Sequence, residues 1–574
     1  MEKTNQEISQ VLYEMAERLE MLDVAFKPRA FERAANSVES FDHSINDLYK
    51  KQGKKALLEI PGVGEGIAER IEEYISTGKI KDLEKLKKKM PVNITELSLV
   101  EGVGPKIIKT LYRKLRIKNL KDLEKAAHSG KLKKLPRFGE KLEKKILKGI
   151  EFQKSSAGRI PLGTALPYAR AIMERIKKSG LVEKISLAGS IIRWKETVGD
   201  IDILVVSKHP QKLSDLFVKM PEVKAVLAKG DTKTMVRLNI GVDADLRIIS
   251  KKSFGSALQY FAGDKNHNVA VRKLAMKKGY KLNEYGLYKG KKQIAGANEK
   301  EIYKKLGMDW IPHEMRRNNG EIEIARAHKI PRLVELKDIK GDLQIQTSWT
   351  DGEHSILEMA KEAMRLGLEY IVITDHTRDL AMTGGSDEKK LLKQMKEIDK
   401  LNRKLKMRKF RILKGAEVNI RKDGSLDIKD EVLAKLDVVG AAVHSNFNLS
   451  KKEQTERVIR AMENPHMDIL FHPTGRLIQK REAIDLDIDA VLKTAKKTNT
   501  VLEINAHPMR LDLKDEHIKR AVELGVKLEI STDAHSMSDM SLMEYGVHQA
   551  RRGWAKKPDI VNARPLEEFL KLLK

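Results

Sequence analysis

Hydrophobic positions follow three different patterns along the chain. Residues 1 to about 155 carry apolar side chains at helical spacing with little sign of strands. From 160, short apolar runs such as DIDILVVS alternate with helical stretches. From 341, runs such as YIVIT and TVLEIN recur, with segments such as HSILEMAKEAMRLG between them. Since a repeated strand-then-helix pattern is typical of a parallel sheet or barrel, we expect a multidomain chain with helical, α+β and α/β parts.

A length of 574 residues suggests roughly three or four domains, and we divide the chain further, into six segments. We expect two helical domains, a mixed-sheet domain, a small mixed domain, a charged linker and an α/β domain. In that order they cover 1–85, 86–155, 156–250, 251–318, 319–340 and 341–574.

A short motif recurs in the helical part. LLEIPGVGEGIAERI spans 57–71, LSLVEGVGPKIIKTL spans 97–111, and a weaker copy, LKKLPRFGEKLEKKI, spans 132–146. Each joins an apolar helix end to a second helix through a glycine turn, which leaves backbone N–H groups free for a phosphate oxygen. The glycines of the two clear copies are Gly62, Gly64, Gly102 and Gly104. An ordinary helical hairpin is the alternative, but repetition in a lysine-rich segment favours sequence-independent DNA binding by helix-hairpin-helix motifs.

The composition narrows the class of partner. The formal net charge is +29, from 111 basic and 82 acidic residues, which favours a polyanion such as nucleic acid. A Lys/Glu-rich surface of a heat-stable protein would explain the many charges but not their imbalance. The absence of cysteine excludes disulfides and a cysteine nucleophile. No long apolar run or signal-peptide pattern is present, so we expect a soluble intracellular protein.

Two carboxylates interrupt the apolar run GDIDILV. Asp200 and Asp202 are two apart, so they face the same side of a strand and repel each other unless a cation lies between them. A second run, VDADLRII, adds Asp243 and Asp245. An edge strand with solvated aspartates is the ordinary alternative. The nearby turn at Gly189 and Ser190, followed by Arg193, offers N–H groups, a hydroxyl and a positive charge to a phosphate.

A phosphate cradle beside several carboxylates is what phosphoryl transfer requires. Two Mg²⁺ ions stabilise the attacking and leaving oxygens, and carboxylates hold them because Mg²⁺ prefers oxygen ligands. The sequence therefore predicts a metal site rather than an edge strand.

These residues carry a family resemblance. GS, Arg193 and GDID, with the later DLR, YFAG and NEYG and the earlier RIP at 159, resemble the family X DNA polymerases, which include DNA polymerase beta. The resemblance covers residues 1 to about 315. It implies a lyase-like helical domain, a fingers-type domain, a nucleotidyltransferase palm and a thumb, in the order of the first four segments.

The resemblance also implies roles for individual residues. Asp200, Asp202 and Asp245 would bind two Mg²⁺ or Mn²⁺ ions, and Asp245 would help activate the primer 3′-hydroxyl. Glu284 would pair with Arg247. The nucleotide would contact Arg159, Gly189, Ser190, Arg193, Tyr260, Phe261 and Asn268, and the DNA would contact Lys27, Gly62, Gly64, Gly102, Gly104, Lys106 and Arg272.

Two departures from that family stand out. Ile191 and Ile192 replace an aromatic residue followed by arginine, whereas Arg193 is retained. Arg70 stands at the Schiff-base lysine position, and a guanidinium cannot form that imine. We therefore expect 5′-phosphate binding through Lys27 and Lys106 rather than lyase activity.

Several strand-like runs after 341 end in a metal-type ligand. Such strand ends converge on one face of an α/β barrel, where sites are built. They are His376, Glu417, His444, His472, Asp533 and His535. With GDLQIQTSWTDG, TDH, GAE, VHS, FHPTGR and STDAHS, the segment resembles a PHP domain. This resemblance implies a distorted seven-stranded barrel, Asp351 as a further ligand, and up to three Zn²⁺ or Mn²⁺ ions.

The first strand departs from the PHP pattern His-x-His, because it carries Gln344 and Gln346. An amide oxygen is a weaker ligand than imidazole for such ions. Either one metal position is weakened and the nuclease still works, or the barrel is a structural remnant. His507 in NAHP is a candidate compensating group, with a core or surface histidine as the alternative.

We therefore expect a DNA-directed DNA polymerase that fills short gaps in base excision repair, with 3′→5′ exonuclease or abasic-site processing in the PHP domain. The expected partners are gapped or primer–template DNA and deoxynucleoside triphosphates, with no membrane, and we expect a monomer in a prokaryotic cytoplasm, associated with the nucleoid. The alternatives are a polymerase with an inactive PHP domain, an RNA-end nucleotidyltransferase, a PHP phosphoesterase as the main activity, and a non-catalytic DNA-end scaffold.

Overall fold

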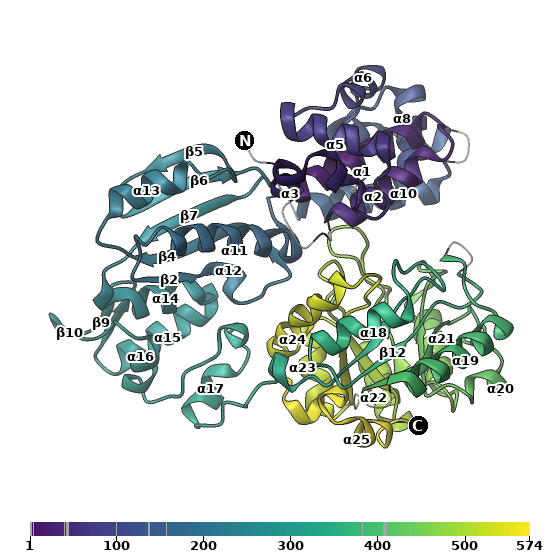
Figure 1. Cartoon of the computed structure of the whole chain (residues 1–574). Coiled ribbons are helices and arrows are strands. Elements are labelled where there is room, and N and C mark those ends of the chain that lie inside the picture. Colours follow the sequence, from purple (N-terminus) through teal and green to yellow (C-terminus); the bar gives the residue numbers. More distant parts are fainter. Residues whose placement is uncertain are drawn as a thin grey trace. The chain divides into compact units, whose positions relative to one another are not determined.

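The chain forms two compact units in the computed structural model (Figure 1). One comprises Met1–Ala157 with Gln479–Arg481, and the other Gly158–Ile478 with Glu482–Lys574. The structure describes residues 3, 5–39, 41, 45–98, 100, 102–135, 138–155, 158–380, 383–405 and 410–574.

The first unit is helical, as the apolar spacing predicts. Its described helices are α1 Asn5–Met21, α2 Lys27–Glu39, α3 Ile45–Gln52, α4 Lys54–Leu58, α5 Glu65–Thr77, α6 Lys81–Lys89, α7 Ile94–Leu97, α8 Pro105–Leu115, α9 Leu120–His128 and α10 Glu140–Ser155, with a 3₁₀ turn, η1 Leu132–Lys134. They enclose two apolar cores. One gathers side chains such as Leu12 and Ile71, and the other gathers Leu111 and Ile146.

A five-stranded sheet opens the second unit, with strand order β2-β4-β7-β6-β5. Its elements are β1 Ile160–Pro161, α11 Leu162–Lys178, β2 Lys184–Leu187, α12 Gly189–Ile192, β3 Thr197–Val198, β4 Asp200–Val206, α13 Pro210–Val218, β5 Val223–Lys229, β6 Lys233–Leu238 and β7 Asp243–Ile248. Only β4 and β7 run parallel within this sheet, and β1 pairs separately with β3. This is the mixed sheet that the sequence predicts.

The next elements build a small mixed domain around an antiparallel sheet of order β10-β9-β8. They are η2 Lys251–Ser253, α14 Phe254–Ala262, α15 Lys265–Lys277, β8 Lys281–Asn283, β9 Gly286–Lys289, β10 Lys292–Ala295, α16 Glu299–Lys305 and η3 His313–Met315. The expected linker 319–340 contains helix α17, Glu321–Arg326, whose Ile322 and Ala325 pack into the same core. Apolar side chains three apart among charges give this short helix a buried face.

A buried ion pair lies in this small domain. Arg316 is fully buried, and its Nη1 donates to Glu299 Oε1 over 2.6 Å, while Nε and Nη2 donate to the Ile311 carbonyl. Trp310 and His313 reach the second Glu299 oxygen, at 2.8 and 3.1 Å. Burial raises the pKa of Glu299, but Arg316 and His313 outweigh burial and hold that pKa well below its ordinary value.

Seven parallel strands then follow one another around a nearly closed barrel, which confirms the predicted fold class. They are β11 Gly341–Ile345, β12 Tyr370–Ile373, β13 Arg411–Asn419, β14 Val438–Ala442, β15 Ile469–Leu470, β16 Val501–Asn505 and β17 Leu528–Ser531. A parallel bridge between Ile345 and Ala534 links the two ends of the strand order.

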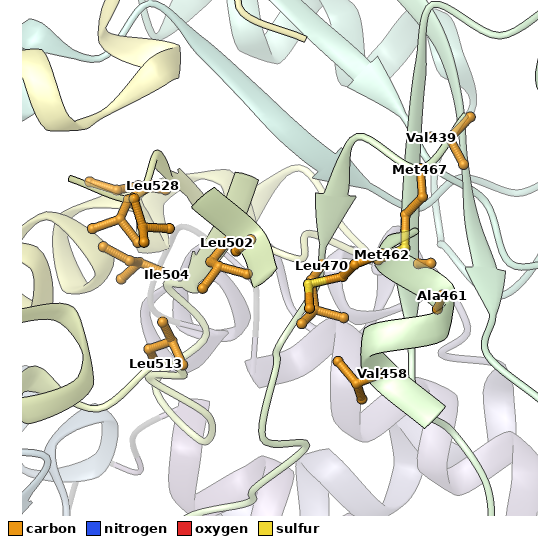
Figure 2. Close-up of a cluster of buried hydrophobic side chains, with 14 of the residues drawn as sticks. Val439, Val458, Ala461, Met462, Met467, Leu470, Leu502, Ile504, Leu513 and Leu528 are labelled. Atoms are coloured by element: carbon orange, nitrogen blue, oxygen red, sulfur yellow. The ribbon is translucent and has the colours of Figure 1, made fainter. Parts of the chain in front are cut away.

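Helices and short 3₁₀ segments precede, connect and follow these strands (Figure 1). They are η4 Leu336–Asp338, α18 Ile356–Arg365, α19 Glu388–Leu405, α20 Asp430–Leu433, α21 Lys451–Met462, α22 Ile488–Thr498, α23 Asp515–Leu524, η7 Ser538–Leu542, α24 Met543–Arg552, η8 Lys557–Asp559, η9 Val561–Ala563 and α25 Leu566–Leu570. Strand side chains such as Leu470 and Leu502 belong to one buried cluster with Val458 and Met462 of α21 (Figure 2). Because this packing fixes the strands, it also fixes the side chains at their ends.

No helix of the described residues is long and apolar enough to cross a membrane.

Candidate active sites

The predicted palm carboxylates lie on the two parallel strands β4 and β7. The strand register places Asp202 opposite Asp245 and Asp200 opposite Asp243, so all four side chains leave the backbone on the same side of the sheet. Asp243 is ion-paired with Arg237. Asp245 is mostly buried, and its Oδ2 lies 3.0 Å from Lys233 Nζ and 3.3 Å from Arg247 Nη2.

Electrostatics at this site favour a bound cation. Burial, and after it the neighbouring carboxylates Asp200 and Asp245, raise the pKa of Asp202 to about 7. A divalent cation bound among these three carboxyl groups would offset their mutual repulsion and so stabilise the ionised form of Asp202. Three hard oxygen donors on adjacent strands therefore fit the two expected Mg²⁺ or Mn²⁺ ions in ligand type.

The turn after β2 lies directly against these carboxylates. Gly189, with φ +64°, begins helix α12, and a Cβ at this position would overlap Asp202 Oδ2. The Ser190 hydroxyl is buried and has no hydrogen-bond partner in the structure. An unpaired buried hydroxyl at a helix start is suited to a phosphate oxygen.

Arg193 ties this turn to the end of α14. Its Nη1 donates to the carbonyls of Gly189, Ala262 and Gly263, at 2.8 to 3.0 Å. Arg159 donates to Thr197 in the strand that leads to Asp200. Both arginines, predicted to contact the triphosphate, thus border the palm carboxylates.

The other predicted nucleotide and template residues cluster at α14 and α15. Tyr260 and Phe261 meet edge to face with ring centroids 5.0 Å apart, and the Arg272 guanidinium lies 5.3 Å from the Tyr260 ring. Asn268 donates to the Tyr260 carbonyl and accepts from Gln259. These contacts hold the aromatic pair beside the end of α14 to which Arg193 is bonded.

The expected pair of Glu284 with Arg247 is wrong for this structure. Among the ion pairs of the described residues, Arg247 pairs with Asp245, two positions away on the same face of β7. Its guanidinium also lies 4.4 Å from the centroid of the Phe261 ring. Asp245 and Phe261 are thus the contacts of the Arg247 guanidinium in this structure.

In the helical unit, the recurring motif has the same hydrogen-bonded turn at each copy. Gly64, Gly104 and Gly139 precede α5, α8 and α10, and each carbonyl accepts bonds from the N–H groups three and four residues later. Gly62 and Gly102 have φ of +77° and +82°. The three helix N-termini therefore present backbone N–H groups as phosphate binding requires.

The predicted lysines lie near these helix starts. Lys27 is exposed and is the first residue of α2, and Lys106 is the second residue of α8. Arg70, at the Schiff-base position, donates hydrogen bonds of 2.5 Å to the Gly66 carbonyl and to Asp82 Oδ2.

One aromatic residue of this unit escaped the sequence analysis. Phe26 is 92% exposed with φ +62° and directly precedes Lys27. A bare aromatic ring beside a cation suits a nucleobase. The signal was its place in the short turn between two amphipathic helices.

Glu417 is the centre of the barrel site. It is fully buried on β13, with Oε1 2.9 Å from His444 Nε2 and 3.0 Å from His472 Nε2. Its Oε2 lies 3.5 Å from His376 Nδ1. Burial raises the pKa of this carboxyl, but the histidines outweigh burial and hold it well below its ordinary value.

Two groups of ligands in the described part of the chain are close enough to share a metal ion. One joins His376, Glu417 and His444, and the other joins Asp351, His376 and His535. Imidazole and carboxylate together suit Zn²⁺ or Mn²⁺. Six of the seven predicted barrel ligands therefore lie together. Five belong to these two groups, and the sixth, His472, contacts Glu417.

The remaining metal position does not fit. Gln344 and Gln346 point their amide nitrogens at Glu417 Oε2, at 2.9 and 2.7 Å, and so act as donors rather than ligands. Asp533, the seventh predicted ligand, instead pairs with Arg510 and accepts from Asn505 Nδ2 over 3.1 Å. Protein donors thus contact Glu417 Oε2 and Asp533 Oδ2 on this side of the cluster.

Arg510 and Asn505 were missed because they are not metal ligands and follow no motif. His507, the candidate compensating group, accepts from the Met509 N–H through Nδ1. Burial lowers the pKa of His507, so the ring is held neutral.

Family models match four stretches of the chain. A helix-hairpin-helix domain covers 3–80, a SAM-like helix-hairpin-helix tandem covers 94–151, the DNA polymerase beta thumb covers 257–317 and the PHP domain covers 342–507.

The chain is also similar to curated proteins. It is 38% identical over 556 residues to the DNA polymerase/3′-5′ exonuclease PolX of Bacillus subtilis strain 168, which covers 96% of either chain. The barrel part is 30% identical over 229 residues to a probable phosphatase of Thermoanaerobacter sp. strain X514, covering 38% of this chain and 88% of that protein. It is 32% identical over 191 residues to a probable phosphatase of Acetivibrio thermocellus, covering 32% and 73%.

Fold, carboxylates and histidine cluster together define a nucleotidyltransferase core joined to a metal-dependent phosphoesterase barrel. The chain belongs to the family X DNA polymerases that carry a C-terminal PHP domain. The predicted enzyme class, a DNA polymerase, is therefore confirmed.

Proposed function

We propose that the protein fills short gaps during DNA repair by template-directed addition of deoxynucleotides. The observation that carries this proposal is the alignment of Asp202 with Asp245 across parallel strands, beside the turn at Gly189 and Ser190. Mg²⁺ ions held by Asp200, Asp202 and Asp245 would supply positive charge for the reacting phosphate when bound.

In the proposed reaction, the primer 3′-oxygen forms a bond to the α-phosphorus of the nucleotide, and the bond from that phosphorus to pyrophosphate breaks. The proton of the 3′-hydroxyl passes to Asp245. Ser190 and Arg193 orient the triphosphate, and Tyr260 and Phe261 pack against its sugar. The helix-hairpin-helix turns hold the DNA backbone without reading sequence, so binding weakens steeply with salt.

For the PHP domain we propose 3′→5′ exonuclease or 3′-end processing with two metal ions rather than three. The supporting observation is that His376, Glu417, His444, Asp351 and His535 form two ligand groups, while Gln344 and Gln346 donate to Glu417. An inactive barrel is the second candidate, favoured by those same two glutamine contacts.

We further propose that the protein acts as a monomer in a prokaryotic cytoplasm, near the nucleoid, since its proposed substrate is there.

One assay tests both sites. A labelled primer on gapped DNA is incubated with the protein and Mg²⁺ or Mn²⁺, with and without deoxynucleotides. Extension that is lost in Asp202→Ala supports the polymerase, and no extension with either metal contradicts it. Shortening without nucleotides that is lost in His444→Ala supports the exonuclease, whereas an unshortened primer indicates an inactive barrel.

A further inference from the structure

Helix α24 of the barrel packs against the palm at Trp194. The His548 imidazole stacks on the Trp194 ring, with centroids 3.7 Å apart and planes 6° apart. The Tyr545 ring meets the Trp194 ring edge to face, with centroids 5.5 Å apart, and the Arg170 guanidinium lies 5.8 Å from the centre of the Trp194 ring. Trp194 is therefore held mainly by side chains that lie more than 350 positions later in the sequence.

The same helix fixes the neighbouring backbone. Arg552 is 7% exposed and its Nη1 donates to the Arg193 carbonyl over 2.8 Å, while its Nη2 pairs with Asp515. Arg193 in turn binds the carbonyls of Gly189 and Gly263. A continuous chain of contacts thus runs from α24 to the turn that lies against Asp202.

Ion pairs and apolar packing make this interface firm. Arg170 forms two parallel bonds to Glu544, at 2.6 and 2.9 Å, and the buried Arg476 pairs with Glu196 at 2.8 Å. Tyr545 belongs to the same buried core as the palm residues around it. Continuous buried packing of this kind resists opening.

His548 also touches the end of the thumb segment. Its Nδ1 lies 2.9 Å from Glu314 Oε1, and Arg551 Nε lies 2.6 Å from the same oxygen. One histidine thus joins palm, thumb and barrel.

Trp194 needs such support because of its backbone. Its φ is +51°, a left-handed conformation that is unfavourable for a bulky residue and persists where the surroundings enforce it. Without the stack on His548, relaxation of Trp194 would shift Arg193 and the turn beyond it.

We propose that α24 is a positioning element for nucleotide binding in the palm, through His548 on Trp194 and Arg552 on Arg193. The inference rests on the proposed polymerase function and is separate from the metal chemistry of the barrel. On this view the barrel contributes to nucleotide affinity even where its own hydrolytic site is silent.

The test compares full-length variants in single-nucleotide insertion on gapped DNA. For His548→Ala we expect the KM for the deoxynucleotide to rise about 3- to 10-fold, the range that loss of one aromatic pair gives, with kcat changed less than about twofold. Nucleotide affinity on a dideoxy-terminated primer should fall by the same factor. His548→Phe, which keeps the stack, should restore both values, whereas His548→Gln, which keeps a hydrogen bond to Glu314, should not.

Controls separate positioning from folding. His209→Ala removes an exposed histidine of the palm and should leave KM unchanged. Unchanged KM in His548→Ala, or equal loss in the Phe and Ala variants, overturns the proposal. So does a matched fall in kcat, exonuclease rate and melting temperature, because that reports unfolding. A wild-type protein that inserts no nucleotide overturns the proposed function and this inference together, whereas wild-type insertion with an unaffected His548→Ala overturns only the inference.

Discussion

Gly189 and Asp202 approach so closely that the turn has no room for a side chain at position 189. The glycine hydrogen faces the carboxylate oxygen, and φ of +64° fits glycine best. The turn that we propose binds phosphate and the aspartate that we propose binds metal are thus in direct contact.

From this contact we expect Gly189→Ala to lower nucleotide insertion at least about 100-fold, since displacement by about 1 Å at a reacting centre costs that much. Gly180→Ala is the matched control. Gly180 has φ +69° but nothing near the position of its Cβ. Single-turnover insertion rates would measure both, and equal rates for the two variants would contradict the overlap at Asp202.

Mg²⁺ binding in the palm should release a proton. With a pKa of about 7, Asp202 is mostly protonated below that pH in the metal-free protein, and the cation must displace the proton. We expect Mg²⁺ affinity to fall up to about tenfold for each pH unit below 7. Calorimetry in buffers of different ionisation enthalpy measures the proton. Identical heats in all buffers at pH 6 would rule out this coupling, and Asp202→Asn should abolish it.

Restoring the PHP pattern at the first barrel strand should add a metal ion. In Gln344→His/Gln346→His, two imidazoles replace the amides that now donate to Glu417. We expect about one more Zn²⁺ or Mn²⁺ per chain by elemental analysis after dialysis. Gln344→Ala/Gln346→Ala controls for simple loss of the amides. Equal metal content in the wild type and the histidine variant would show that Arg510 still keeps the position closed.

Removing Arg316 should destabilise the thumb strongly. Arg316→Leu leaves the buried Glu299 carboxylate without its cation, which costs about 3–5 kcal/mol. Arg326→Leu, an exposed arginine on α17, should change stability by less than about 0.5 kcal/mol. Denaturant unfolding compares them. In the double variant Arg316→Leu/Glu299→Gln, part of the loss should return, because no unpaired charge remains.

Phe26 should contribute to DNA affinity by stacking. Truncation to alanine should weaken binding to gapped DNA by about 1–3 kcal/mol, the worth of one base on an aromatic ring. Leu227→Ala removes an exposed apolar side chain of the edge strand β5, outside the helix-hairpin-helix motifs, and should have little effect. Fluorescence anisotropy with labelled DNA at fixed salt gives both affinities, and equal affinities would assign Phe26 no role.

The palm aspartates were accessible from the sequence because strand alternation puts Asp200 and Asp202 on one face and does the same for Asp243 and Asp245. Pattern alone does not tell which strands lie together. The register that aligns Asp202 with Asp245 is a property of the folded sheet.

Contacts between remote side chains were out of reach for the same reason. Arg510 follows no ligand motif, yet it forms an ion pair with Asp533, a predicted metal ligand. The expected pair of Glu284 with Arg247 is replaced by an ion pair of Arg247 with Asp245, which lies two positions away on the same strand. His548 and Trp194 each read as an ordinary residue in its own segment, and only the fold makes them neighbours.

Because α24 lies at residues 543–552, the helix that supports Trp194 is synthesised well after the palm. The palm, with all of its aspartates, is synthesised long before this support exists. On the proposal above, a palm made before residues 543–552 would have its aspartates but a weaker hold on the nucleotide. Nucleotide affinity would reach its full value only after α24 has been synthesised and has packed against Trp194.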